Sequence, residues 1–478
     1  MNRIFQRVKI LTFSIGVVLF VVAAILVWLR HNNNVKIILD FAENNILGRK
    51  LNNYQEWFAV VRSAIAVGIA GFFCWAAASI TLAFVSIEQL LLVTRKHLLG
   101  VSLFFASLLA LLLRVSGLEY VSIDYSAFIE PWTNYLRQNN ITRGGGLATI
   151  DSNYTAPYLL ILGFISYLPE NIALAAVKFV SILFDFILSV VVFKTVFFVT
   201  KSLKKSFASF CAVLFCPTVF LNSGFWAQCD GIYTTFLILA LLFFLQNKAR
   251  WALLVYGIAF SFKLQSIFIL PFIIILYIFG KWKFKDLLFA FIGFFGITAV
   301  TWLFGSPVYY WLLALVKQLG GYSELTLNAP TVFGLVNGIN NSVAGAALSN
   351  AGIIFTASML AGVFFMSLYK RTTDMGKMVS LYLLSAMITV YFLPHMHERY
   401  FYVVEIASII YAACFPKRWF VCPLIIFSGS SVYMPFLFGI TVFDLRIFSC
   451  IMLFCVILLS KWHIESVLIK DTATERKL

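Results

Sequence analysis

The segment PHMHERYFY, residues 394–402, places two histidines, a glutamate and an arginine between two apolar runs. The whole chain has only 5 histidines, so this concentration stands out. Arg399 is suited to bind phosphate because a guanidinium donates two parallel hydrogen bonds. His395 and His397 are further donors, and Glu398 can orient one of them. We predict a phosphate-binding segment here; the alternative is a polar interfacial turn whose charges satisfy each other.

Two carboxylates lie in VSIDYSAFIEPW, residues 121–132. Asp124 is followed by aromatic and apolar residues, and a carboxylate in such a setting at a membrane surface is a suitable general base. The alternative is an ordinary solvated loop aspartate. Glu130 could hold Asp124 in place, bind a cation or remain solvated.

The segment NSGFWAQCDGIY, residues 222–233, brings together Trp226, Gln228 and Asp230. An indole ring with amide and carboxylate neighbours is a plausible platform for a sugar, because the ring stacks while the polar groups bind hydroxyls. The alternative is a helix capped by Asp230 that follows an interfacial tryptophan.

Lys263 and Gln265, in SFKLQ, lie deep in apolar surroundings, where a lysine is costly and therefore a functional candidate. Asp185, in the middle of an apolar run, either has a similar role or pairs with a lysine of a neighbouring helix. A metal site is not favoured, because two residues that are two positions apart, His395 and His397, do not share one face of a helix.

The elements that must position these residues are transmembrane helices. The chain has 478 residues, is 62% hydrophobic and has only 12% charged residues. Apolar runs of about 18–25 residues recur along it. We predict an all-α polytopic membrane protein of about 12–14 spans. The net charge of +16 comes mostly from Lys and Arg in short loops, which set orientation, so nucleic acid is not expected as a partner.

If these basic loops are cytoplasmic, the polar segments above all face outward. We predict three parts: a two-span N-terminal extension at 1–97, a core at 98–280 with an outer loop at 119–155, and a C-terminal transmembrane region at 281–478 with outer loops at 306–330 and 394–400. The sequence lacks a D-x-D motif and a Walker A motif, so a nucleotide-activated substrate is not supported.

Six strings, taken in this order, resemble the bacterial branch of the GT-C integral-membrane glycosyltransferases: IDYSAFIEPW, NYTAPYLLIL, FWAQCDGIYTTFLILAL, FKLQSIFILP, ELTLNAP and PHMHERYFY. The resemblance covers about 98–460 and leaves the first two spans without a role. It implies a GT-C-like bundle with a large first extracytoplasmic loop that carries the catalytic carboxylate, at the position of Asp124.

The resemblance also implies the reaction. Such enzymes take a sugar from a polyprenyl-phosphate carrier at the outer face of the membrane and pass it to a glycan or glycolipid acceptor. Basic residues near the outer surface bind the lipid phosphate. Arg399 fits that role, and so could His395, His397 and Lys263. Together with the polar residues named above, the candidates for substrate binding are Glu130, Trp226, Gln228, Asp230, Lys263, Gln265, Asn328, His395, His397, Glu398 and Arg399.

Some relatives have a tighter acidic pair than Asp124 and Glu130, so no cofactor is certain and a divalent cation stays open. We expect a hexosyltransferase of the bacterial inner membrane, with its active site facing the periplasm or exterior, that acts on a surface polysaccharide or lipopolysaccharide O-antigen. The alternatives are a flippase for lipid-linked oligosaccharides, which would show internal symmetry, and an O-antigen polymerase, which more often relies on a late, arginine-rich outer loop.

Overall fold

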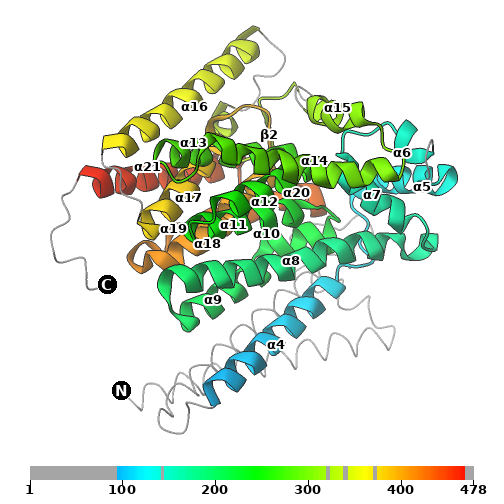
Figure 1. The fold of residues 1–478 in the computed structure, drawn as a ribbon, viewed down its shortest axis with the longest axis horizontal. Coiled ribbons are helices and arrows are strands. Elements are labelled where there is room, and N and C mark those ends of the chain that lie inside the picture. The colour runs from blue at the N-terminus through cyan, green and yellow to red at the C-terminus, as the bar shows by residue number, and fades with distance from the viewer. Residues whose placement is uncertain (1–93, 142–144, 319–322, 337–342, 370–373, 469–478) are drawn as a thin grey trace, which may run out of the picture. The chain divides into compact units, whose positions relative to one another are not determined.

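The computed structural model describes residues 94–141, 145–318, 323–336, 343–369 and 374–468 (Figure 1). The two spans predicted within 1–97 lie outside these residues. The described N-terminal helix α4, Thr94–Val115, belongs to a compact unit that ends at Gly117. Residues from Leu118 onward form a second unit, which contains every candidate site residue. The predicted division of the chain at residue 97 stays a prediction.

The second unit is built almost entirely from helices. Its α-helices are α5 Glu130–Asn139, α6 Gly146–Thr149, α7 Ala156–Ile165, α8 Glu170–Thr200, α9 Leu203–Leu214, α10 Pro217–Phe220, α11 Asp230–Leu245, α12 Ala249–Phe262, α13 Leu270–Ile278, α14 Leu287–Leu303, α15 Val308–Gln318, α16 Val343–Tyr369, α17 Met375–Phe392, α18 Tyr402–Cys414, α19 Val421–Ser431, α20 Tyr433–Phe438 and α21 Leu445–Leu468.

Shorter elements connect these helices. The π-helical segments are η2 Tyr125–Ile129 and η3 Leu221–Phe225, and the 3₁₀ segments are η4 Leu264–Ile269, η5 Phe284–Asp286, η6 Val332–Val336, η7 Glu398–Phe401 and η8 Pro416–Arg418. The described residues contain one two-stranded sheet, in which β1, Thr326–Leu327, pairs in parallel with β2, Met396–His397.

Seven of the described helices are long and apolar enough to cross a bilayer, or up to eight if a bent pair counts as one span. The pair consists of Leu203–Leu214 and Pro217–Phe225 and bends by 45°. Pro217 explains the bend, because proline cannot donate the hydrogen bond that would continue the helix. The chain is thus an all-α polytopic membrane protein, as the sequence predicts. The total of 12–14 spans stays a prediction, since residues 1–93 are not described.

Helices α8, α11, α12 and α14 pack side by side in that order (Figure 1). Glycines bring α12 and α14 into backbone contact: a Cβ on Gly257 would lie 1.9 Å from the Ala290 carbonyl oxygen, and one on Gly293 would lie 2.0 Å from that of Leu254. Small residues allow this approach, and close packing is a main source of helix association in lipid.

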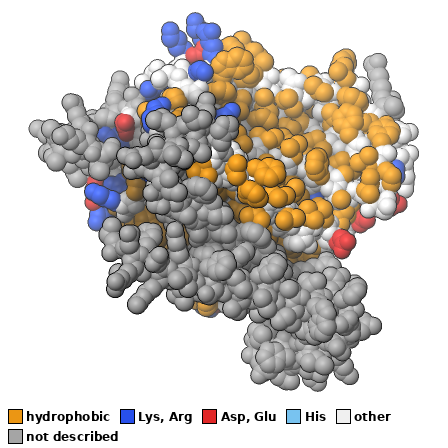
Figure 2. Space-filling model, turned by 90° about the horizontal axis from the view of Figure 1, so that it is seen from below, with side chains coloured by type: hydrophobic (Ala, Val, Ile, Leu, Met, Phe, Trp, Pro, Cys, Tyr) orange, Lys and Arg blue, Asp and Glu red, His pale blue; other side chains and the backbone are white. Residues whose placement is uncertain are grey.

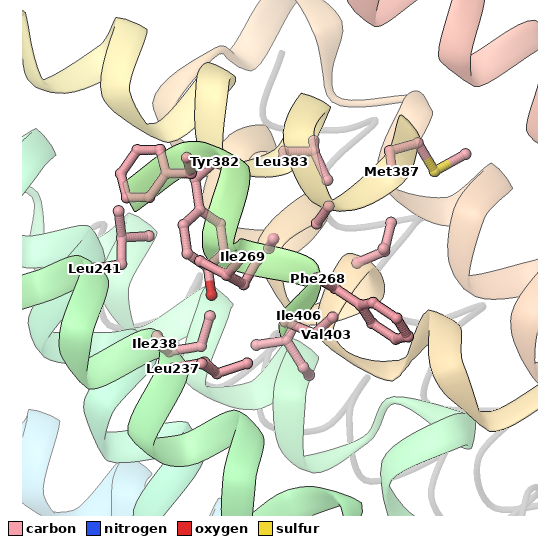
Figure 3. Close-up of a cluster of buried hydrophobic side chains, with 14 of the residues drawn as sticks. Leu237, Ile238, Leu241, Phe268, Ile269, Tyr382, Leu383, Met387, Val403 and Ile406 are labelled. Atoms are coloured by element: carbon pink, nitrogen blue, oxygen red, sulfur yellow. The ribbon is translucent and has the colours of Figure 1, made fainter. Parts of the chain in front are cut away.

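The core of the bundle is centred on α17, whose candidate span is 83% buried, against 22% for that of α16. Figure 3 shows apolar side chains from four elements meeting there: Leu237, Ile238 and Leu241 of α11, Phe268 and Ile269 of η4, Tyr382, Leu383 and Met387 of α17, and Val403 and Ile406 of α18. The core therefore joins α11, which begins within the polar segment 222–233, to α17 and α18, which flank the polar segment 394–402.

Apolar side chains cover much of the described surface in Figure 2, and Lys and Arg gather at its margin. Large exposed hydrophobic residues lie along the spans, for example Phe179 on α8, Phe291 on α14 and Ile354 on α16. This distribution fits helices that face lipid, with basic residues at their ends.

The segment SFKLQ, residues 261–265, contains a break between helices. Helix α12 ends at Phe262, Lys263 is extended with φ −155° and ψ 132°, and η4 begins at Leu264. Because the extended residue interrupts the helical path, its side chain can turn toward the bundle interior. Thr155 reinforces the break by donating a hydrogen bond from Oγ1 to the Phe262 carbonyl over 2.8 Å.

Candidate functional site

Asp124 lies at the start of a short helical stretch, immediately before η2, and its backbone is helical. The loop before it is held by α8, because the Lys178 ammonium donates to the carbonyls of Leu118 and Tyr120. The Ser122 hydroxyl donates to the Trp226 carbonyl over 2.8 Å and accepts the Tyr125 amide N–H. These bonds fix the carboxylate of Asp124 next to the segment at 222–233.

One oxygen of Asp124, Oδ2, accepts two hydrogen bonds. The Trp226 indole Nε1 donates over 2.9 Å and the Gln228 amide Nε2 over 2.8 Å. Arg399 Nη2 lies 3.7 Å from the same oxygen. The other oxygen, Oδ1, has no hydrogen bond or ion pair with the described residues, yet it is not among their fully buried unpaired atoms. It is therefore accessible and can accept a proton from a ligand.

Trp226 and Gln228 are two positions apart, yet both reach one oxygen. Ala227, between them, has a φ of 63°, in the left-handed region that non-glycine residues rarely adopt. This conformation turns both side chains toward Asp124. It costs roughly 1–2 kcal/mol, and such strain is typical of functional sites. Asp124 directly precedes η2 and Trp226 directly follows η3; π-helical segments are also frequent at functional sites.

Arg399 joins the group through Gln228. Its Nη1 donates to the Gln228 Oε1 atom, which also accepts a hydrogen bond of 2.9 Å from the Tyr154 hydroxyl. The guanidinium carbon lies 5.3 Å from the centre of the Trp226 ring. Its Nε is buried without a hydrogen-bond partner among the described residues. Three elements far apart in sequence thus meet at Asp124, and one donor of the guanidinium remains unused.

The guanidinium of Arg399 stays positively charged. Burial by itself lowers the pKa of this guanidinium, but the acidic groups around it, which include the carboxylates of Asp124, Asp230 and Glu398, together raise it, so that its pKa lies well above the usual value. Burial raises the pKa of the Tyr154 hydroxyl well above its ordinary value. Tyr154 therefore stays protonated and donates to Gln228, and the site keeps one fixed cation beside one carboxylate.

Trp226 is fully buried, and both faces of its indole are covered. Phe436 stacks against it with ring centres 4.6 Å apart, Tyr433 meets it edge-on at 4.8 Å, and Arg399 lies over the ring. In this structure the indole is thus a hydrogen-bond donor to Asp124. The sugar-stacking role that the sequence suggested for Trp226 stays a prediction and would require Arg399 to move.

Lys263 and Asp230 form a buried ion pair next to this group. Asp230 Oδ2 also accepts a hydrogen bond of 2.9 Å from the Asn222 amide, and Lys263 Nζ lies 5.6 Å from the centre of the Tyr233 ring. Pairing offsets the cost of burying both charges. Gln265 is buried, and its Oε1 has no hydrogen-bond partner among the described residues.

The histidines point elsewhere. Both ring nitrogens of His395 are engaged, Nδ1 by the Glu324 carbonyl at 2.7 Å and Nε2 by the Ser349 hydroxyl at 3.1 Å. His397 Nδ1 lies 3.8 Å from the carboxylate of Glu398, which is buried. Thus His395 fastens the loop at 323–330 and α16. No described hydrogen bond or ion pair connects either histidine with Asp124.

Two other candidates, Asn328 and Glu130, have no described contact with Asp124. Asn328 has a φ of 54° and donates to the Val432 carbonyl over 2.7 Å. Glu130 begins α5, and no hydrogen bond or ion pair joins it to Asp124 among the described contacts. Asp185 accepts a hydrogen bond of 2.5 Å from the Ser223 hydroxyl and lies 3.5 Å from the Tyr402 hydroxyl. Both hydroxyls are partners of Asp185, and its pairing with a lysine of a neighbouring helix stays a prediction.

Within the described residues, no group of three or more His, Cys, Asp or Glu side chains could hold a metal ion. Tyr154 is the contributor to the site that the sequence did not single out. It lies in NYTAPYLLIL, one of the strings that carry the resemblance, but a tyrosine beside an apolar run is equally typical of the membrane surface.

Comparison with known protein families found no family model that matches the chain, and comparison with curated proteins found no match either. The function must therefore be argued from the site.

Proposed function

We propose that the chain is a glycosyltransferase of the GT-C type, which moves a hexose from a polyprenyl-phosphate donor to a glycan or glycolipid acceptor. The observation that carries the proposal is that Asp124, in a membrane-embedded bundle, has an accessible oxygen, Oδ1, while its other oxygen, Oδ2, lies 3.7 Å from a fixed cation, Arg399. Displacement of a sugar from a lipid phosphate needs both: a base for the incoming hydroxyl and a cation for the departing phosphate.

The reaction proceeds in one displacement. Asp124 Oδ1 takes the proton of the acceptor hydroxyl, whose oxygen attacks the anomeric carbon from the face opposite the phosphate. The bond between that carbon and the phosphate oxygen breaks, and the polyprenyl phosphate leaves with the electron pair. Arg399 stabilises the charge that grows on the phosphate oxygens. The anomeric configuration is inverted because only one displacement occurs.

The hydrogen bonds to Oδ2 support this division of labour. Trp226 and Gln228 fix the orientation of the carboxylate, which leaves Oδ1 for the acceptor. Lys263 is neutralised by Asp230, so the role of phosphate ligand falls to Arg399 first. We place the protein in the bacterial inner membrane with Asp124 toward the periplasm or exterior, and we propose a surface polysaccharide or lipopolysaccharide O-antigen as the acceptor.

Transfer by the purified protein tests the proposal. A panel of synthetic polyprenyl-phosphate hexoses, labelled in the sugar, is offered with membranes from cells that lack the gene as the source of acceptor. We expect label to pass to a glycan or glycolipid. Asp124→Asn should lower the rate by about 10²–10⁴, the usual contribution of general base catalysis.

The matched control is Asp444→Asn, a substitution of the same type in an exposed loop, where Asp444 pairs with Arg446. It should leave the rate unchanged. Full activity in Asp124→Asn would remove Asp124 as the base, and the absence of transfer from every donor by the wild type would overturn the proposed function.

A further inference from the structure

A row of aromatic side chains begins beside Asp124. Phe128 and Trp132 follow it at intervals of four residues along η2 and α5, and side chains at this spacing lie on one side of a helix. The ring centres of Phe128 and Trp132 are 5.8 Å apart, and those of Trp132 and Tyr154 are 5.3 Å apart. We refer to Phe128, Trp132 and Tyr154 as the aromatic row.

The row is accessible at its outer end and connected to the site at its inner end. Phe128 is 48% exposed, and Trp132 and Tyr154 are partly exposed. The Tyr154 hydroxyl donates to Gln228, which in turn donates to Asp124. A ligand that binds along the row would therefore reach Asp124, the proposed base.

The row is also held in place. The loop before Tyr154 is fixed from α15, where the Tyr310 hydroxyl donates to the Ser152 carbonyl over 3.0 Å and Lys317 pairs with Asp151 at 2.6 Å. Tyr158 continues the stack inward, with its ring centre 5.0 Å from that of Tyr154. An arrangement held in this way lowers the entropic cost of ordering the site when a ligand binds.

We propose that the aromatic row is a carbohydrate-binding platform that holds a pyranose ring of the acceptor against Asp124. Sugars bind aromatic faces through their C–H groups while neighbouring polar groups take the hydroxyls. The helix that carries Trp132 favours a sugar over a lipid tail, because its sequence, EPWTNYLRQN, is mostly polar. The polar groups that can take hydroxyls lie at the inner end of the row, where the Tyr154 hydroxyl donates to Gln228 and Asp124 Oδ1 is accessible. The assignment to the acceptor rests on the proposed function.

Binding of soluble sugars tests the platform without any donor lipid. The protein is placed in nanodiscs, and its affinity for methyl pyranosides of glucose, galactose and mannose is measured by saturation-transfer NMR, with sorbitol as the open-chain control. We expect at least one pyranoside to bind and sorbitol not to bind. Trp132→Ala should weaken binding by about 3–10-fold, the value of one aromatic contact.

Matched variants separate stacking from folding. Trp132→Phe keeps a ring at the site and should retain most of the affinity. Trp251→Ala removes an indole that is 59% exposed at the start of α12 and should change nothing. With an active enzyme, Trp132→Ala should raise the KM for acceptor and leave the KM for donor unchanged.

Each result distinguishes the platform from the proposed reaction. Equal affinity in the wild type and Trp132→Ala, or no pyranoside binding by the wild type, would overturn the platform even if transfer occurs. An effect of Trp132→Ala on thermal stability alone would make the row an interfacial anchor and would likewise overturn it. Pyranoside binding that depends on Trp132, in a protein that transfers no sugar, would retain the platform and reject the glycosyltransferase.

Discussion

The two oxygens of Asp124 have different surroundings, and this difference decides what the residue can do. Oδ2 is occupied by the Trp226 and Gln228 donors, whereas Oδ1 is accessible. A carboxylate that only stabilised the fold would be expected to use both oxygens. Arg399 is similar, because its Nη1 donates to Gln228 while its Nε has no hydrogen-bond partner among the described residues. Each side chain thus has one polar atom that is held by hydrogen bonds and one that has no described partner.

For the single residue Arg399, the substitution Arg399→Lys tests the role of the guanidinium as well as removal of the side chain does. One ammonium cannot replace a planar fork that contacts Gln228 and Asp124 at once. We expect transfer to fall by about 10²–10³, the usual cost of losing one well-placed donor, with a raised KM for the lipid donor. Initial rates over a range of donor concentrations measure both.

The control for Arg399→Lys is Arg250→Lys, because Arg250 pairs with Asp286 outside the site. It should leave both constants unchanged. If Arg399→Lys has wild-type kinetics, the phosphate is held by another group and the role of Arg399 is structural.

The sequence was informative about which residues matter and less so about what each one contacts. Asp124, Gln228 and Arg399 stood out because polar side chains between apolar runs are expensive to keep. Their convergence depends on long-range packing, which no local pattern encodes. The same limit explains why Lys263 gave no sign of its pairing with Asp230, and why His395 gave none of its bonds to Glu324 and Ser349.

Among the elements, the contact of α12 with α14 is the one most sensitive to a single methyl group. Gly257→Ala and Gly293→Ala would each place a Cβ about 2 Å from a backbone carbonyl oxygen of the other helix. Backbone cannot move aside as a side chain can, so the helices must separate. We expect each variant to lose about 1–3 kcal/mol, the usual cost of overpacking, seen as a lower Tm in detergent.

Gly296→Ala provides the control on the same helix. A Cβ at Gly296 has nothing within 4 Å, and alanine favours the helix by about 0.5–1 kcal/mol over glycine. Its Tm should be equal to or above that of the wild type. Equal Tm values for all three variants would mean that α12 and α14 do not pack as closely as described.

Element positions were predictable where the apolar runs were long. The apolar runs that the sequence shows near 172–200, 231–246 and 401–415 correspond to α8, α11 and α18 within about two residues. The polar connections were not predictable in the same detail. The Ser223–Gly224 pair in η3 is a turn signal, but residue type does not indicate a π-helix there or in η2, or a left-handed conformation at Ala227.

For the whole molecule, the distribution of basic residues predicts one orientation in the membrane. Lys204 lies in the first turn of α9, within a basic stretch of the chain, and Gln138 lies near the end of α5; both are exposed. In a chain whose native cysteines are replaced, a membrane-impermeant maleimide should label Gln138→Cys in intact cells and Lys204→Cys only after permeabilisation. This outcome follows from the retention of basic loops in the cytoplasm.

Labelling of the two positions from the same side would contradict the predicted topology, and the reverse pattern would place Asp124 toward the cytoplasm. The membrane class itself is fixed by composition, because apolar runs of this length have no soluble alternative. The packing of the helices against one another could not be predicted from composition, because it depends on individual contacts at small residues such as Gly257.

The parallel pairing of Thr326–Leu327 with Met396–His397 ties two loops together through their backbones. Peptide hydrogen bonds of this kind form a stiff mechanical link that does not depend on side-chain identity. If the 323–330 loop moves, we therefore expect residues 396–397, which directly precede Glu398 and Arg399, to move with it. A structural change in the 323–330 loop would in this way alter the position of the Arg399 guanidinium.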